Sequence, residues 1–107
     1  MTNIGNMFKK IQDLQIKMKD LENKIQNSEY TSSVGGGSVK VTIDGKGTIK
    51  KLFIEPSLCS EKESETISEL IILAINSAKS EAEKEKEKEL KQLTGGLTLP
   101  PGFSLPF

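Results

Sequence analysis

Apolar residues near the N-terminus recur at alternating steps of three and four positions along the chain. They are Ile4, Met7, Ile11, Leu14, Met18, Leu21 and Ile25. This spacing is a heptad repeat with apolar a and d positions, which is typical of a helix whose narrow apolar seam packs against another helix. The pattern predicts a coiled-coil helix from about Asn3 to Asn27, about 35 Å long, with its remaining faces in water.

A period of two, which is typical of β-strands, follows this helix. Residues 30–34 predict a short strand rich in Thr and Ser, and the three glycines at 35–37 predict a bend after it. Residues 39–44 alternate apolar and polar side chains and predict a half-buried strand. The Asp-Gly-Lys-Gly sequence at 44–47 predicts a tight hairpin turn, and residues 48–55 then return as a third strand.

The returning strand carries apolar residues on both of its faces. Strict alternation predicts Ile49 and Phe53 on one face, with Leu52 and Ile54 on the other. Apolar residues on both faces of a strand indicate burial from both sides. Because one pair of helices in a small chain covers only part of this surface, we expect a second copy of the chain to cover the rest.

A second long helix is predicted to begin at a capping box formed by Ser60 and Glu63. Its expected buried stripe consists of Ile67, Leu70, Ile71, Ala74, Ile75, Ala78 and Ala82. Ile72 and Leu73 widen this apolar surface and indicate an intersubunit contact. Residues 83–91 are nearly all charged, so we expect this part to project from the body as an arm until the glycines at 95–96 stop the helix.

These elements predict a single α+β dimerising domain at residues 1–96, in the order long helix, three-stranded antiparallel sheet and long helix. Residues 97–107 form an apolar, proline-rich C-terminal tail for which an extended conformation is expected. Disorder is the usual state of such a terminus. Because Phe103, Leu105 and Phe107 are large apolar residues, docking on the body or on a partner subunit is favoured, and recognition by another protein is the alternative.

The charge of the chain is balanced overall but unevenly distributed. Its fifteen basic residues match its fifteen acidic residues, and every basic residue is lysine. Residues 1–58 hold nine lysines and six acids, whereas residues 59–107 hold six lysines and nine acids. Lysine is a hydrated point charge, whereas arginine has the planar fork that suits guanine edges. If the partner is a nucleic acid, its phosphates are therefore the expected target.

Several classes of chemistry have little support in the composition. Histidine is absent, so the chain lacks the usual general base and imidazole metal ligand, and the single Cys59 has no histidine to activate it. The glycines at 35–37 lack the Gly-Lys-Ser/Thr ending of a phosphate-binding loop. The longest apolar run, residues 70–75, is too short to cross a bilayer, and no secretory signal is visible. We expect a cytoplasmic protein that is not an enzyme and has no cofactor, metal ion, membrane association or small-molecule substrate.

Lysines at helical spacing are the candidate DNA-binding residues. Lys10, Lys17 and Lys24 lie seven residues apart and should line one edge of the first helix beside the apolar seam. Such lysines often only keep a helix flank soluble, so this interpretation stays open beside DNA binding. Auxiliary candidates are Lys9, Lys84, Lys88 and Lys91. The candidate dimer interface consists of Leu52, Ile54, Leu70, Ile72 and Leu73.

Three short motifs, in this order and spacing, resemble the YbaB/EbfC family of bacterial nucleoid-associated proteins. They are VKVTIDG at 39–45, EPSL at 55–58, and the ending LPPGF at 99–103 with Pro106-Phe107. The resemblance spans essentially the whole chain. It implies a tweezers-like homodimer with projecting helical arms, and a cytoplasmic, nucleoid-localised protein that binds double-stranded DNA. It assigns no DNA-contacting residues, so the lysines above remain inferences from helix geometry.

Two hypotheses follow from these patterns. The first is a homodimer that binds double-stranded DNA with little sequence specificity through lysine–phosphate contacts from its helical arms, organising or bending the DNA. The alternative is a coiled-coil chaperone or protein-interaction scaffold resembling prefoldin, which also joins two long helices through a small β unit. The alternative requires apolar seams on both helices out to their tips, and residues 83–89 have none.

Overall fold

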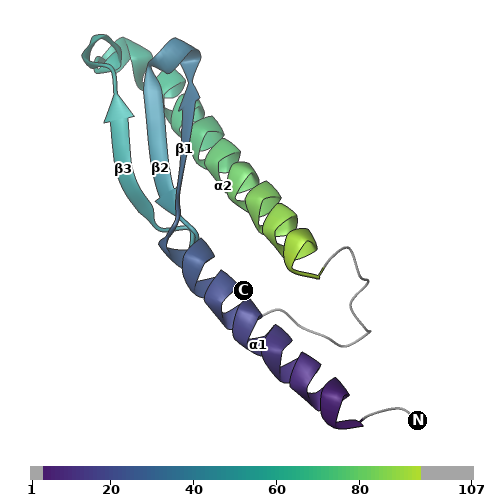
Figure 1. The fold of residues 1–107 in the computed structure, drawn as a ribbon. Coiled ribbons are helices and arrows are strands. Elements are labelled where there is room, and N and C mark those ends of the chain that lie inside the picture. Colours follow the sequence, from purple (N-terminus) through teal and green to yellow (C-terminus); the bar gives the residue numbers. More distant parts are fainter. Residues whose placement is uncertain (1–3, 95–107) are drawn as a thin grey trace.

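The computed structural model describes residues 4–94, which form two long helices joined through a small sheet (Figure 1). The helices are α1 (Ile4–Asn27) and α2 (Ser64–Thr94), and the strands are β1 (Glu29–Val34), β2 (Val39–Asp44) and β3 (Ile49–Ile54). Short 3-10 turns occupy Gly35–Gly37, Pro56–Leu58 and Glu61–Glu63. The predicted α+β fold is confirmed. Asn3, the predicted helix stop at 95–96 and the tail at 97–107 lie outside the described residues.

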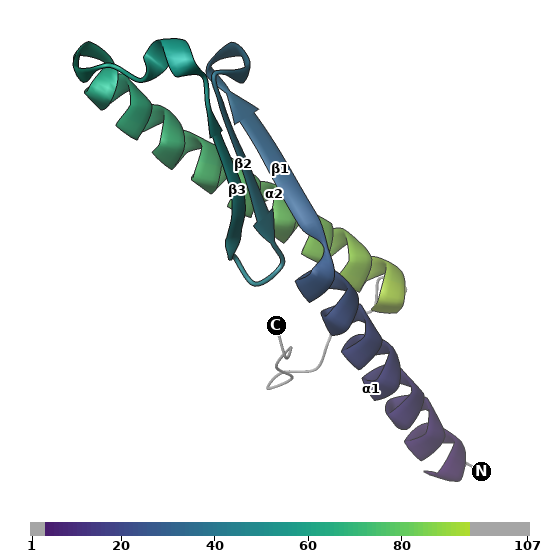
Figure 2. The same ribbon diagram turned by 90° about the vertical axis from the view of Figure 1, so that its left-hand side faces the viewer.

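The sheet is antiparallel with the strand order β1-β2-β3, and α2 lies across one of its faces against β1 and β2 (Figures 1 and 2). The buried core between them consists of Val39, Val41, Ile43, Ala74, Ala78 and Ala82. Small alanine side chains let the backbone of α2 approach the sheet closely. Each fully buried Val or Ile side chain stabilises such a core by about 1.5–3 kcal/mol.

The predicted buried stripe of α2 is confirmed, but the capping box at its start is not. The three alanines of the stripe are buried, and its isoleucines and Leu70 are half-buried. Ser60 makes no side-chain cap hydrogen bond. Because the first turn is a 3-10 turn, the Glu63 N–H donates to the backbone carbonyl of Ser60 at 3.1 Å instead of to its hydroxyl. The α-helical part therefore begins at Ser64.

A β-bulge in β3 changes the faces predicted for that strand. Thr42 pairs with Lys51, but the next residue, Ile43, pairs with Ile49, which leaves Lys50 without an opposite partner. Since cross-strand partners share a face, Ile49 lies on the side of buried Ile43, together with Leu52 and Ile54. The prediction that Ile49 shares a face with Phe53 is wrong. Phe53 pairs with Lys40 on the opposite face, where the Lys40 ammonium lies 5.6 Å from the centre of the Phe53 ring.

Asp44 holds the hairpin turn between β2 and β3 together. Its carboxylate accepts hydrogen bonds from the backbone N–H groups of Lys46 at 2.9 Å and Thr48 at 3.0 Å, and it pairs with the Lys50 ammonium at 3.6 Å. Burial alone raises the pKa of Asp44. The hydrogen bonds from Thr48 and Lys46 and the charge of Lys50 outweigh that effect, so its pKa lies below the usual value.

The hairpin turn also fixes the direction of α1. A Cβ atom on Gly45 would lie 1.8 Å from the carbonyl oxygen of Ile25, so only glycine allows the last turn of α1 to pack this closely on the hairpin. The predicted seam of α1 is consequently covered only near the sheet. Its C-terminal members Met18, Leu21 and Ile25 are buried, whereas the members at the N-terminal end are exposed: Ile4, Met7 and Ile11.

Both helices extend past the sheet, and the N-terminal part of α1 continues beyond the end of α2 (Figures 1 and 2). The charged segment at 83–91 forms the predicted arm. It lies beside α1, and several of its residues are half-buried: Glu85, Lys86, Glu89 and Leu90. The segment therefore differs from a fully solvated helix, because its inner side contacts the last turns of α1 and the hairpin.

Candidate nucleic-acid interface

The α1 arm carries an excess of positive charge. It holds five lysines, at positions 9, 10, 17, 19 and 24, against three acids, at positions 13, 20 and 22, so its net charge is +2. Lys9, Lys10 and Lys17 are exposed, and within residues 4–94 none of their ammonium groups has an ion-pair partner. These side chains are available for an external anion.

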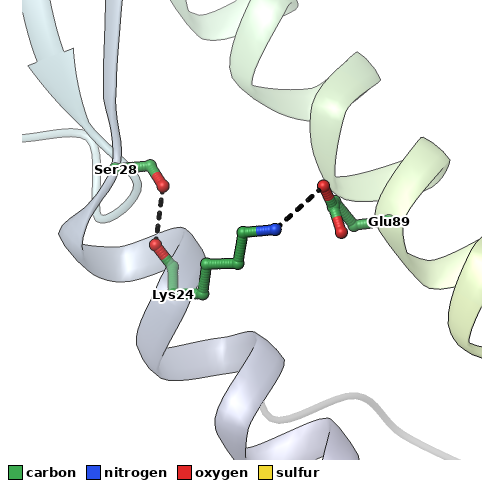
Figure 3. A network of polar contacts seen from close by, with 3 residues as sticks. All are labelled: Lys24, Ser28 and Glu89. Atoms are coloured by element: carbon green, nitrogen blue, oxygen red, sulfur yellow. Dashed lines mark hydrogen bonds and ion pairs between the residues drawn. The ribbon is translucent and has the colours of Figure 1, made fainter.

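Lys24 is the third of the three predicted lysines that are spaced seven residues apart, and it has a partner within the chain. Its ammonium pairs with the Glu89 carboxylate at 3.3 Å and so connects α1 to the arm of α2 (Figure 3). Ser28 donates a hydrogen bond from its hydroxyl to the Lys24 carbonyl at 2.7 Å, which closes the end of α1 (Figure 3). The Lys24 side chain remains 65% exposed. A partly exposed pair of this kind stabilises the fold by about 0–1 kcal/mol.

The lysines of the α2 arm are surrounded by acids. Lys84, Lys88 and Lys91 are exposed on α2, as predicted, and Lys84 lies 3.9 Å from the Glu81 carboxylate. The segment 83–94 holds four lysines and four glutamates, so its net charge is zero. This arm attracts a polyanion less strongly than the α1 arm does.

The five candidate interface residues fall into two groups. Leu52 on β3 is 49% exposed, because α2 covers β1 and β2 and leaves β3 open. Ile72 and Leu73 on α2 are 61% and 55% exposed. Ile54 and Leu70 are half-buried and pack against the chain's own core. The exposed group lies partly on the edge strand β3 and partly on α2.

Sequence reasoning missed three lysines that the fold brings together. Lys46 belongs to the β2–β3 turn, while Lys79 and Lys86 belong to α2, and all three line one hollow beside that turn. Lys46 and Lys79 are 33 positions apart in the sequence, so no periodicity connects them. Only the packing of α2 on the hairpin places them side by side.

Other classes of site receive no support from the described part of the chain. No group of three or more His, Cys, Asp or Glu side chains among residues 4–94 is arranged to hold a metal ion. None of the helices within the same range is long and apolar enough to cross a membrane.

Comparisons with known proteins agree with this architecture. The model of the YbaB/EbfC DNA-binding family matches residues 1–97. A nucleoid-associated protein of Rhodospirillum rubrum is 40% identical over 107 residues, and nucleoid-associated proteins of Brucella anthropi and Brucella ovis are 44% and 45% identical; each match covers both chains fully. The crystal structure of an uncharacterised Helicobacter pylori protein has the same fold, with a TM-score of 0.70 and 24% identity over 89% of this chain and all of that one. This chain belongs to the YbaB/EbfC DNA-binding family.

Proposed function

We propose that the chain is a nucleoid-associated protein that binds double-stranded DNA with little sequence specificity, as a homodimer whose helical arms contact backbone phosphates. The observation that carries the proposal is a set of exposed ammonium groups on a projecting arm, which have no ion-pair partner among residues 4–94: Lys9, Lys10 and Lys17. The family, which is a DNA-binding one, and the names of the relatives support it. They also support a location in the nucleoid.

Contacts from lysine favour the DNA backbone over its bases. An ammonium group binds a phosphate as a point charge, and each neutralised phosphate releases condensed counterions. Without arginine, the chain lacks the bidentate fork that most often reads guanine. The expected affinity therefore depends strongly on salt and weakly on DNA sequence.

The homodimer in this proposal is supported by the open apolar surface at Leu52, Ile72 and Leu73. A monomer would leave these three large apolar side chains in water, and exposed apolar surface of this kind marks an interaction site. Pairing of two such surfaces across a twofold axis covers both, and Ile54 and Leu70 lie next to the same surface. It also gives the assembly two pairs of arms.

Fluorescence anisotropy with several unrelated duplexes, each at two salt concentrations, tests the function. We expect similar affinities for all duplexes and a steep fall in affinity at the higher salt concentration. Binding that ignores salt, or an absence of binding at low salt, contradicts the proposal.

A second candidate function is favoured by one observation, the exposed apolar side chains at the tip of α1. Ile4, Met7, Phe8 and Ile11 are all more than half exposed, as the arm of a prefoldin-like chaperone or scaffold requires. The α2 arm has no matching seam at 83–89. Suppression of aggregation of a model protein, measured on the same sample as DNA binding, distinguishes the two functions.

A further inference from the structure

We propose that the hollow between the β2–β3 turn and α2 binds one phosphate group of the DNA backbone. The hollow has a volume of about 300 Å³ and is partly open to solvent. Lys46 lines it from the turn, and Lys79 and Lys86 line it from α2. This site is separate from the lysines at the outer part of the α1 arm, and the proposal rests on the DNA-binding function above.

The charges around the hollow are unbalanced in favour of an anion. Two carboxylates also line it, and both already have partners. Glu83 pairs with the Lys86 ammonium at 3.4 Å. Asp44 accepts two backbone hydrogen bonds in the turn and pairs at 3.6 Å with Lys50, which does not line the hollow. Within the described range 4–94, Lys46 and Lys79 have no ion-pair partner, so two ammonium charges face the hollow uncompensated.

The scaffold of the hollow is well held. The Asp44 hydrogen bonds hold the turn that carries Lys46, and the close contact of Gly45 with Ile25 fixes that turn against α1. Lys79 and Lys86 lie seven residues apart on α2, so they share one side of the helix. The Lys86 side chain is only 21% exposed, because it packs beside the hollow and pairs with Glu83. A preformed site loses little conformational entropy when an anion binds.

The shape and lining of the hollow favour a phosphate that belongs to a polymer. Ligand pockets for free small molecules are enclosed and mostly apolar, with volumes of about 300–1,000 Å³. This hollow is at the small end of that range, is partly open and presents mainly polar groups. It can therefore hold a charged group while the rest of the ligand stays outside.

The position of the hollow suits a DNA-binding dimer. The hollow lies beside the β2–β3 turn. That turn is at the end of the sheet from which α1 projects (Figure 1). Ile72, Lys79 and Lys86 are spaced by seven residues, so the hollow is on the same side of α2 as exposed Ile72 of the proposed dimer surface. A duplex held between the arms of two subunits would reach this point at the base of each arm.

The test compares the double variant Lys46→Gln/Lys79→Gln with the matched control Lys51→Gln/Lys62→Gln. The control removes the same charge at exposed lysines that do not line the hollow and that have no assigned contact with DNA. The double variant should lose two phosphate contacts per dimer. This loss should reduce the slope of log affinity against log salt by about 2 and weaken binding about 30-fold at 0.15 M salt. The control should keep the wild-type slope, and Lys46→Arg/Lys79→Arg should restore binding. Circular dichroism confirms that each variant is folded.

A titration with inorganic phosphate at constant ionic strength, followed by NMR of backbone amides, separates this site from the DNA-binding function. We expect the Lys46 and Gly47 amide signals to shift in the wild type and not in Lys46→Gln/Lys79→Gln. If the wild type does not bind DNA, the proposed function fails, and the phosphate shifts alone decide whether the site stands. The site is refuted if the folded double variant binds DNA with the wild-type slope, or if the control loses as much affinity as the double variant. It is also refuted if phosphate shifts neither the Lys46 nor the Gly47 amide signal of the wild type.

Discussion

Replacement of Lys10 and Lys17 by glutamine is the sharpest test of the proposed contacts on the α1 arm. Both ammonium groups are exposed and have no ion-pair partner within residues 4–94, so each is able to neutralise one phosphate. A dimer would lose four contacts, and the slope of log affinity against log salt should fall by about 3.6. Between 50 mM and 200 mM salt, that slope corresponds to about a 150-fold change in affinity that the variant no longer shows.

Lys24→Gln provides an internal comparison, because Lys24 is already paired with Glu89 at 3.3 Å. A phosphate contact by Lys24 would compete with that pair. Lys24→Gln should therefore reduce the slope of log affinity against log salt by less than the loss of one full phosphate contact per subunit would. Fluorescence anisotropy of one short duplex across a salt series measures the DNA affinity of the wild type, Lys10→Gln/Lys17→Gln and Lys24→Gln. Lys51→Gln/Lys62→Gln is the charge-matched control. An unchanged slope in folded Lys10→Gln/Lys17→Gln, or an equal change in the control, refutes the assignment of phosphate contacts to the α1 arm.

Three further predictions concern the dimer surface and the hairpin. Leu52→Glu/Leu73→Glu should convert the dimer to folded monomers, because charges then occupy the open apolar surface; a sedimentation profile equal to that of the wild type contradicts this. Asp44→Asn should lower the free energy of unfolding at neutral pH. Since the folded-state pKa of Asp44 lies below the unfolded value of 3.8, its stabilisation is complete above that value and is lost as pH falls through the folded-state pKa, so the difference between the two proteins should shrink there. Urea unfolding at several pH values measures this difference in the free energy of unfolding between the wild type and Asp44→Asn. A difference that grows in acid would contradict the prediction. Gly45→Ala should destabilise the fold by about 3 kcal/mol, because the added Cβ atom collides with the Ile25 carbonyl. At Gly36 an added Cβ atom meets nothing within 4 Å, but φ is +67°, so Gly36→Ala should destabilise the fold by only about 1 kcal/mol. Thermal melts measure both variants. Equal losses for the two variants would contradict the proposed role of Gly45.

Local periodicity predicts much of this fold, because the spacing of apolar residues within each element indicates which of its sides is buried. The heptad spacing marks a helix that the structure places at Ile4–Asn27, and the alternation in β2 identifies the core residues Val39, Val41 and Ile43. The spacing of Ala74, Ala78 and Ala82 likewise identifies the side of α2 that meets the sheet. These features depend on residues close together in the sequence.

Features that depend on long-range packing were not predictable in the same way. The bulge at Lys50, which moves Ile49 to the face of Leu52, leaves no mark in the apolar pattern of β3. The pair between Lys24 and Glu89 joins residues 65 positions apart, so helical spacing gave Lys24 as a cation available for DNA. The hollow at Lys46 and Lys79 arises only when α2 packs beside the hairpin.

Sedimentation velocity of the purified chain at micromolar concentration tests most directly whether two subunits join through β3 and α2. We predict one species with about twice the chain mass of 11.7 kDa. A folded species at the mass of a single chain would contradict it, since one subunit alone has no second pair of arms with which to hold a duplex.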